Sequence, residues 1–265
     1  MPAILDQILY QKRKWIEEKK KSFSFSELEK LLASAPRLRD AYAYILKEVD
    51  GEIPIIAEIK KKSPSLGEIV SELNISKWAE GYEKAGARAI SVLCDEDYFS
   101  GSFEDLSLAK HSCQLPVLCK DFIISSFQVL LARIYGADLV LLIVRALEKS
   151  KLAELFFLIK ELGMTPLVEV HNRAELEIAL ELGARLLGIN NRDLNTLEIN
   201  LDTTSELIHY IPSDRIVISE SGFSKREELE RFRKMGVQAF LIGSSILRSE
   251  NPFDKLKKLV YGSKG

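Results

Sequence analysis

The chain has 265 residues, of which 46% are hydrophobic and 29% are charged, and its formal net charge is −2. This length fits one large domain, since α/β barrels commonly occupy about 250 residues. The near-neutral charge gives no field that would attract nucleic acid or a membrane surface, and no apolar run in the sequence reaches membrane-spanning length.

Three helices are predicted before the first strand. Residues 3–20 carry apolar and charged side chains at helical spacing. Ser26 is followed by Glu29 three residues later, which predicts a capping box at the start of a second helix. A third short helix is predicted over residues 37–48. The first 50 residues are therefore expected to form a helical extension of a single domain that spans the whole chain, residues 1–265.

After this extension the pattern changes to apolar runs that alternate with helix-periodic segments. Near-continuous apolar strands between helices are typical of a parallel sheet that is covered on its outside. Consecutive units of this kind favour a closed barrel over an open doubly wound sheet. The predicted fold class is therefore α/β, a (β/α)8 TIM barrel with an N-terminal helical extension. The eight runs are IPIIAEI, ARAISVL, LPVLCK, ADLVLLIV, TPLVEV, ARLLGI, DRIVIS and QAFLIG.

Polar side chains gather at the carboxyl ends of nearly all these strands. Glu58 and Lys60 fall on one face of the first strand, where they are costly to bury unless they are paired or face a wet cavity. An edge strand with solvated charge is the alternative for this stretch. The distribution as a whole predicts strands that converge on one mouth. The other strand ends carry Asp95, Lys120, Arg145, Glu169, Asn190 and Arg192, Glu220 and Ser221, and Gly243 and Ser244.

The last two strand ends are turns rich in glycine and serine, at the places where barrels commonly bind phosphate. Their sequences are Glu220-Ser221-Gly222 and Gly243-Ser244. Glycine lets backbone N–H groups approach an anion, and the following helix N-termini add a favourable dipole. Either turn alone would suit an ordinary helix cap, but their joint position favours a phosphate site.

Two charged residues are candidates for acid–base chemistry. Lys120 ends the third strand, where it could carry charge to a substrate, donate a proton or form a Schiff base. A simple pairing with Asp121 is disfavoured because adjacent strand residues diverge. Glu169 is flanked by apolar residues, so partial burial is expected to raise its pKa toward a general-acid or general-base role. A surface glutamate at a frayed strand end is the alternative.

The sixth strand is followed by Asn190, Asn191 and Arg192, which could hold a planar carboxylate or could instead pin the following loop. No HExxH, P-loop or GxGxxG pattern occurs, so metal hydrolysis, nucleotide use and dinucleotide redox chemistry lose support. The histidines have no metal-binding spacing and are expected at the surface; they are His111, His171 and His209.

The cysteines are Cys94, Cys113 and Cys119, an odd number with no CxxC pair. This predicts reduced core thiols in a cytoplasmic protein and argues against a disulfide framework or a zinc site. The first residues lack a long apolar stretch after a basic start, so no signal peptide is expected.

Seven segments in this order and spacing resemble the indole-3-glycerol-phosphate synthase family of tryptophan biosynthesis, and the resemblance spans essentially the whole chain. It implies a carboxy-lyase that uses no cofactor or metal. The implied reaction converts 1-(2-carboxyphenylamino)-1-deoxyribulose 5-phosphate into indole-3-glycerol phosphate, carbon dioxide and water. The segments are IAEIKKKSPSLGEI, SVLCDEDYFSGSFEDL, LPVLCKDF, PLVEVHN, GINNRDL, VISESGF and AFLIGSSILR.

The resemblance also implies roles for individual residues. Lys120 would protonate the ketone oxygen as the ring carbon attacks, and Glu169 would assist proton transfer in the later dehydration. Lys60 would fix the phosphate or carboxylate and the ketone region, and Glu58 would hold the lysines and substrate hydroxyls. The implied substrate-binding residues are Ser63, Phe122, Leu142, Asn190, Arg192, Glu220 and Ser221, with Phe122 and Leu142 as an apolar wall for the aromatic ring; the implied phosphate-binding residues are Gly222, Gly243 and Ser244, together with Ser221.

The chain departs from the family pattern at Lys62, where many relatives carry a small residue, and at Arg145, where many carry an apolar one. Two other functions stay open. One is another phosphate-binding barrel enzyme, such as phosphoribosylanthranilate isomerase. That chemistry requires an Asp and a Cys on opposite sides of the barrel as an acid–base pair, whereas Cys94 and Asp95 are adjacent in the sequence. The other is a catalytically silent barrel that binds phosphorylated ligands or a partner protein.

The expected partner is a phosphorylated small molecule, with no nucleic acid and no membrane. A monomer is compatible with the sequence, although the N-terminal helices could cover the barrel mouth or meet a neighbouring chain.

Overall fold

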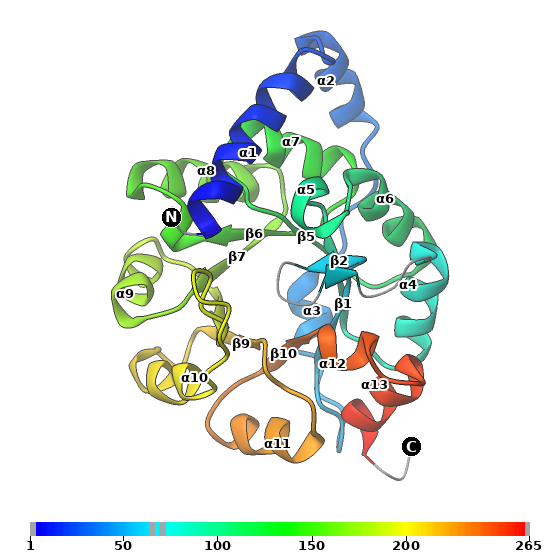
Figure 1. Cartoon of the computed structure of the whole chain (residues 1–265), viewed down its shortest axis with the longest axis vertical. Helices are drawn as coiled ribbons and strands as arrows, with labels where there is room; N and C mark the ends of the chain where they lie inside the picture. The colour runs from blue at the N-terminus through cyan, green and yellow to red at the C-terminus, as the bar shows by residue number, and fades with distance from the viewer. Residues whose placement is uncertain (1–3, 64–66, 69–72, 263–265) are drawn as a thin grey trace.

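The computed structural model describes residues 4–63, 67–68 and 73–262. In this part of the chain, eight parallel strands close into a barrel, seen nearly end-on in Figure 1. Helices alternate with the strands around its outside, so the predicted (β/α)8 barrel is confirmed. In order around the barrel the strands are β1 (Ile55–Ile59), β10 (Ala239–Ile242), β9 (Ile216–Glu220), β8 (Leu186–Asn190), β7 (Thr165–Val170), β6 (Leu139–Ile143), β5 (Val117–Lys120) and β4 (Ala89–Leu93).

The helices that follow the strands form the outer layer of the molecule, and shorter pieces lie in the connections. The longer helices are α4 (Ile75–Lys84), α6 (Phe103–Ser112), α7 (Ser126–Ile134), α8 (Lys149–Glu161), α9 (Arg173–Glu181), α10 (Asp202–Leu207), α11 (Arg226–Lys234) and α13 (Pro252–Tyr261). The shorter pieces are α5 (Glu96–Phe99), η1 (Val144–Ala146), η2 (Ile208–Tyr210) and α12 (Ser244–Leu247). A small antiparallel ribbon of β2 (Lys62–Ser63) and β3 (Gly67–Glu68), which the sequence did not predict, follows β1.

Helices α1 (Ile4–Lys20), α2 (Phe25–Ala33) and α3 (Ala41–Ile45) precede β1, as predicted. The capping box of α2 was placed two residues too late. The hydroxyl of Ser24 accepts the N–H of Glu27, and the Glu27 carboxylate accepts the N–H of Ser24. Both serines in this stretch have a glutamate three residues later, so the spacing alone does not distinguish them. The third helix is also shorter than the predicted 37–48.

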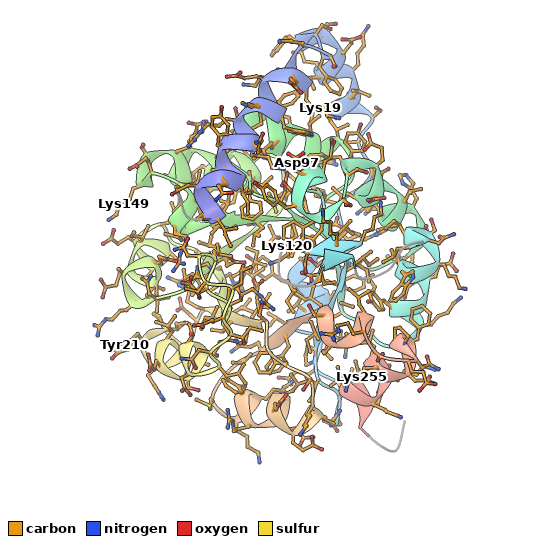
Figure 2. All side chains as sticks on the ribbon, viewed as in Figure 1. Lys19, Asp97, Lys120, Lys149, Tyr210 and Lys255 are labelled. Carbon is orange, nitrogen blue, oxygen red and sulfur yellow. The ribbon has the colours of Figure 1, made fainter. Side chains whose placement is uncertain are left out.

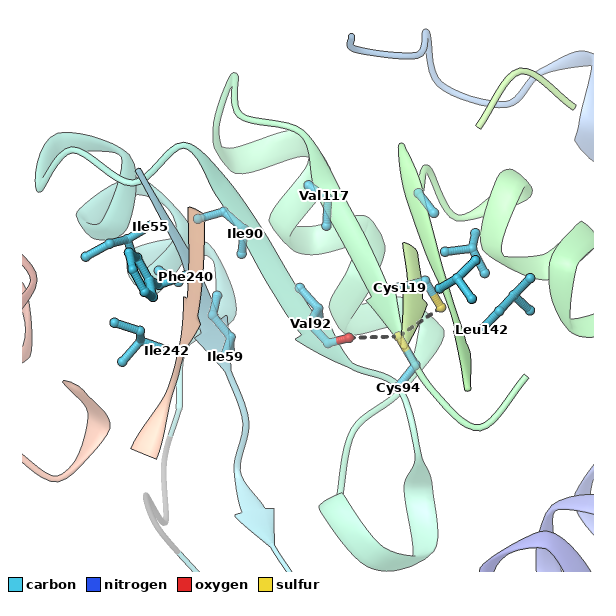
Figure 3. Packing of buried hydrophobic residues seen from close by; sticks show 14 of the residues in the cluster. Ile55, Ile59, Ile90, Val92, Cys94, Val117, Cys119, Leu142, Phe240 and Ile242 are labelled. Carbon is cyan, nitrogen blue, oxygen red and sulfur yellow. Dashed lines mark hydrogen bonds between the residues drawn. The ribbon is translucent and has the colours of Figure 1, made fainter. Parts of the chain in front are cut away.

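The strand side chains divide between two apolar clusters, because successive residues point to opposite faces of the sheet. Outward-facing side chains such as Ile55, Val117 and Phe240 pack against the helices (Figure 3). Inward-facing side chains at the beginnings of the strands fill the barrel, where Ala41 and Ile45 of α3 join them. Apolar side chains therefore fill this end of the barrel, and the polar side chains predicted at the strand ends lie at the other. The inward set includes Ile56, Leu118, Leu139, Leu167, Leu186, Ile216 and Ala239.

Helix α1 is attached to the barrel by a buried ionic contact. The ammonium of Lys12 lies 2.7 Å from Asp95 Oδ2 and 2.7 Å from Asp121 Oδ1, and all three side chains are almost fully buried. Burial alone would lower the pKa of Lys12, but the two carboxylates outweigh it and hold that pKa above its usual value. Lys12 is therefore charged, and it links the extension to residues that follow β4 and β5.

The three cysteines are buried free thiols, as predicted. Cys94 and Cys119 lie on the outward face, with their sulfur atoms 3.7 Å apart (Figure 3). Among the residues that the structure describes, no helix has the length and apolarity needed to cross a bilayer.

Candidate active site

A cavity of about 840 Å³ opens at the carboxyl ends of the strands. Most of the residues predicted from the strand ends converge on it, so the structure brings together side chains that are up to 190 positions apart in the sequence, from Glu58 to Arg248. Lys120 lies near the centre of the ring of strands (Figure 2). The predicted residues that line the cavity are Glu58, Lys60, Lys120, Phe122, Glu169, Asn190, Arg192, Glu220, Ser221, Gly222, Gly243 and Ser244.

The centre of the cavity is a network of lysines and carboxylates. Lys120 Nζ lies 2.6 Å from Glu220 Oε2 and 3.3 Å from Glu169 Oε2, and Lys60 Nζ lies 2.6 Å from Glu58 Oε1. Burial would lower the pKa of Lys120, but Glu220 and Glu169 outweigh it and hold that pKa well above its usual value. Lys120 is therefore a charged ammonium that faces carboxylates from two other strands, and it does not pair with its sequence neighbour.

The two carboxylates beside Lys120 have different proton affinities. The prediction that burial raises the pKa of Glu169 is wrong: burial acts in that direction, but Lys120 and His171 outweigh it and hold the pKa of Glu169 well below its usual value. Burial, together with repulsion from Glu169, raises the pKa of Glu220 to about 7 even though Lys120 opposes the shift. Glu169 is therefore ionised at neutral pH, whereas the raised pKa of Glu220 lies close to neutral pH.

Two glycines make room for the carboxylates of Glu220 and Glu58, each on the strand next to the glycine. A Cβ atom at Gly188 of β8 would overlap Oε1 of Glu220, and a Cβ atom at Gly243 would overlap the carboxylate of Glu58. The backbone at Gly188 has no left-handed conformation that would require glycine. Glycine is needed here because the carboxylate of the adjacent strand occupies the space of a side chain.

Replacing Gly188 with alanine is expected to lower turnover by at least about tenfold, because the added methyl group displaces the Glu220 carboxylate from Lys120, and small displacements of reacting groups cost up to about 100-fold. Steady-state kinetics would measure the loss. The double variant Gly188→Ala, Glu220→Asp has a shorter acid and is expected to recover part of it. A single variant with unchanged turnover would contradict this account of the glycine.

The end of β8 resolves an alternative that the sequence left open. Asn190 and Arg192 line the cavity, and the Arg192 guanidinium donates to the carbonyl of Leu197. Asn191 instead points away and pins the loop: its amide donates to the carbonyls of Glu220 and Ser221 and to Ser219, and its oxygen accepts from Thr204. Asn190 and Arg192 therefore face the cavity, and both Asn191 and Arg192 hold the loop that follows β8.

The two predicted phosphate turns lie side by side in the cavity wall, because β9 and β10 are paired. Ser221 and Gly222 both have positive φ, 66° and 95°, which turns the backbone sharply after β9. Ser245 and Arg248 also line the cavity, and the sequence analysis did not single them out. Arg248 lies in the AFLIGSSILR segment, at the end of α12, and it brings a cation to the part of the cavity with the glycine turns.

Two predicted binding residues lie outside this cavity. Leu142 is fully buried in the outward cluster (Figure 3), whereas Leu141 and Ile143 line the cavity; the side chains of a strand alternate, so the predicted apolar wall is one residue out of register. Ser63 lines a smaller adjoining space of about 80 Å³, between the mouth and Ile4, Leu5 and Ile8 of α1.

The prediction that His171 lies at the surface is wrong. Its side chain is 3% exposed and lies between the carboxylates of Glu169 and Glu175. Arg145, a departure from the family pattern, does not line the cavity; it donates to Glu175 and Asp193 instead. A histidine two residues after Glu169, immediately past the end of β7, was the sequence signal that could have identified this buried position.

In the described residues, no group of three or more His, Cys, Asp or Glu side chains is arranged to hold a metal ion. The chemistry available at the mouth is that of two ammonium groups, several carboxylates, two guanidinium groups and backbone turns. Such a set can bind an anion and transfer protons to and from a bound molecule.

Comparisons with known proteins add a family assignment to this geometry. The family described as "Indole-3-glycerol phosphate synthase" matches residues 5–259. An indole-3-glycerol phosphate synthase from Aquifex aeolicus (strain VF5) is 52% identical over 208 residues, which is 78% of this chain and 80% of that protein.

Solved structures of other proteins share the fold at low sequence identity. A 3-hexulose-6-phosphate synthase from Salmonella typhimurium has a TM-score of 0.62 at 13% identity, covering 78% of this chain and 96% of that one. A thiamine phosphate pyrophosphorylase from Pyrococcus furiosus has a TM-score of 0.59 at 14% identity, covering 79% and 94%. These likenesses support the barrel architecture.

Proposed function

From the premise that this chain belongs to the indole-3-glycerol phosphate synthase family, an enzyme family of tryptophan biosynthesis, we propose how its barrel mouth carries out the reaction. The enzyme acts as a carboxy-lyase on 1-(2-carboxyphenylamino)-1-deoxyribulose 5-phosphate and needs no cofactor. It closes the indole ring with loss of carbon dioxide and water. We also propose that residues 1–265 work as one domain, in the cytoplasm and as a monomer, on a phosphorylated small molecule and without nucleic acid or membrane.

The observation that carries this proposal is the position of Lys120. Its ammonium lies between Glu169 and Glu220, in the same cavity as the glycine and serine turns after β9 and β10. A phosphate held at those turns leaves the rest of the substrate to extend across the mouth toward Lys120. The aromatic end would then lie against Phe122, Leu141 and Ile143.

In the first step, the ring carbon that bears the carboxylate attacks the ketone carbon of the substrate, and Lys120 protonates the ketone oxygen as the new bond forms. Loss of carbon dioxide then returns the bonding electrons to the ring. Glu220, whose pKa of about 7 lies near the operating pH, can return a proton to Lys120 across their 2.6 Å contact.

In the last step, the hydroxyl formed from the ketone takes a proton from the recharged Lys120 and leaves as water, and the neighbouring carbon loses a proton to complete the indole. Glu169, ionised at neutral pH, accepts that proton. Lys60, paired with Glu58, binds the carboxylate and the ketone region before reaction, and Asn190 and Arg192 contact the anthranilate end. Ser63 lies close enough to the mouth to assist once substrate fills it.

The rival functions fit the site less well. An isomerase of the phosphoribosylanthranilate type needs a cysteine and an aspartate facing each other across the mouth. Here Cys94 faces outward into the apolar cluster and Asp95 is paired with Lys12. A silent binding barrel would have no reason to keep two carboxylates within 3.3 Å of a buried ammonium.

A continuous fluorescence assay tests the proposal. Purified protein mixed with the carboxyphenylamino substrate is expected to form the fluorescent indole product and to release one carbon dioxide per product. Added chelator is expected to leave the rate unchanged, because no step uses a metal. Tight binding of the substrate with no product would favour the silent barrel instead.

A further inference from the structure

A row of charged side chains runs behind the cavity wall, away from the proposed substrate. Its centre is His171, whose Nε2 lies 3.2 Å from Glu169 Oε1 and whose Nδ1 lies 3.0 Å from Glu175 Oε2. His171 does not line the cavity, whereas Glu169 does. Among the described residues, neither Nε2 nor Glu169 Oε1 has a hydrogen-bond partner, so their 3.2 Å approach is an ion pair. The imidazole therefore contacts the reacting site through Glu169.

The row continues on the other side of Glu175. This glutamate also accepts the backbone N–H of His171 and the Nε of Arg145, at 2.9 Å and 2.8 Å. Arg145 in turn reaches Asp193 at 3.1 Å, and Asp193 accepts the N–H groups of Asn195 and Thr196 in the loop after β8. Leu194 and Leu197 of this loop line the cavity.

We propose that His171, held by Glu175 and Arg145, is a positioning residue that orients the Glu169 carboxylate for proton transfer. This inference rests on the proposed function, because it assumes that Glu169 is the base. Nothing in the resemblance assigns a role to His171 or to Arg145. The ring is fixed by two acceptors on opposite sides, so it can hold one carboxylate oxygen while the other faces Lys120.

The charges around His171 and Glu169 give the arrangement a second effect. Burial would lower the pKa of His171, but Glu169 and Glu175 outweigh it and raise that pKa to about 9, against repulsion from Arg145. The imidazole is therefore a cation at neutral pH. Glu169 also faces Lys120 and Asn190, so Lys120 and His171 are the two cations that keep it ionised. Lys120 itself also faces Glu220 and Glu58.

Two isosteric substitutions separate the contacts of the ring. In His171→Gln the amide nitrogen takes the place of Nε2, so a neutral donor to Glu169 remains. In His171→Asn the amide takes the place of Nδ1, so the contact to Glu175 remains and the contact to Glu169 is lost. The exposed His209 offers a matched control, His209→Asn.

The expected result for His171→Asn is a fall in kcat of about 10- to 100-fold with KM changed less than about threefold, because orientation of the base matters in the chemical step. Loss of the nearby cation raises the pKa of Glu169 from its low value, so the acid limb of the kcat profile is expected to move toward higher pH. His171→Gln is expected to keep more of kcat and to show the same direction of shift, and His209→Asn to match the parent enzyme.

Nitrogen NMR of the imidazole provides a readout that does not depend on turnover. The His171 signal, assigned by its loss in the variants, is expected to stay in the charged form up to about pH 9 in the parent and to titrate at lower pH in Glu169→Gln. A merely structural histidine would lower the unfolding temperature in His171→Asn without moving the pH limb. An unshifted limb, or a His171 that titrates near pH 6.5, would overturn the inference.

The variant Glu169→Gln separates this inference from the proposed function. If Glu169→Gln loses turnover while His171→Asn keeps both its rate and its pH profile, the positioning role fails and the proposed function stands. If Glu169→Gln keeps full turnover, the assignment of Glu169 as the base fails, and the role of His171 fails with it.

Discussion

Replacing Lys120 with alanine is expected to lower kcat by about 1,000-fold or more. A positioned general acid contributes about 10²- to 10⁴-fold, and this variant also leaves Glu220 and Glu169 without their shared ammonium. The two carboxylates then repel each other, so at least one of them takes up a proton at neutral pH. Steady-state fluorescence of the indole product measures the loss.

Two further measurements make this result specific. Inorganic phosphate is expected to bind the variant about as tightly as it binds the parent, since the glycine and serine turns after β9 and β10 are unchanged. The exposed Lys149, which pairs with Glu181 at the surface, serves as a matched control, and Lys149→Ala should keep full activity. Unchanged turnover in Lys120→Ala would remove this lysine from the mechanism.

Replacing Lys12 with methionine is expected to lower the free energy of unfolding by about 3 to 5 kcal/mol, the usual cost of removing one partner from a buried ion pair. Asp95 and Asp121 would remain buried with no ammonium between them. The effect depends on pH. The folded-state pKa of Lys12 is raised, so its stabilisation is fully present below about pH 10.5 and is lost as the pH rises through the folded value.

Urea unfolding at pH 7 would measure this loss. The matched control is Lys19→Met on the same helix, because Lys19 makes an exposed ion pair with Glu96 and exposed pairs contribute about 0 to 1 kcal/mol. Equal stability of the two variants would contradict the anchoring role of Lys12. If Lys12→Met keeps its free energy of unfolding but limited proteolysis cleaves α1 from the barrel, the contact holds the extension in place without stabilising the barrel.

The barrel could be predicted from the sequence because its signals are local and repeated. Each of the eight strands is an apolar run of four to six residues followed by a helical pattern, and all eight are observed. The strand-end residues were identified for the same reason, since Lys120 and Glu169 interrupt otherwise apolar runs. Because the strands of the barrel are parallel, residues at their carboxyl ends are expected at the same mouth.

The remaining features depend on contacts between distant parts of the chain, which no local pattern encodes. The low pKa of Glu169 depends on Lys120, 49 residues away, and the raised pKa of Glu220 comes from burial and from repulsion by Glu169. His171 was expected at the surface although Glu169 and Glu175 are close to it in the sequence; the Arg145 on η1 that holds Glu175 beside it comes near only after folding. Leu142 shows a different limit: the strand was right, but its face was assigned from family likeness and not from alternation.

The glycines at Gly188 and Gly243 have a consequence for how this enzyme can be altered. At each glycine the carboxylate of the adjoining strand occupies the space that a side chain would need. The residue at one position therefore limits which side chains fit on the adjoining strand. Libraries that randomise the barrel positions one at a time would find Gly188 and Glu220 both intolerant, and would miss combinations in which a shorter acid accommodates a larger neighbour. Paired randomisation across adjacent strands is therefore the productive route to new ring-closing specificities in this scaffold.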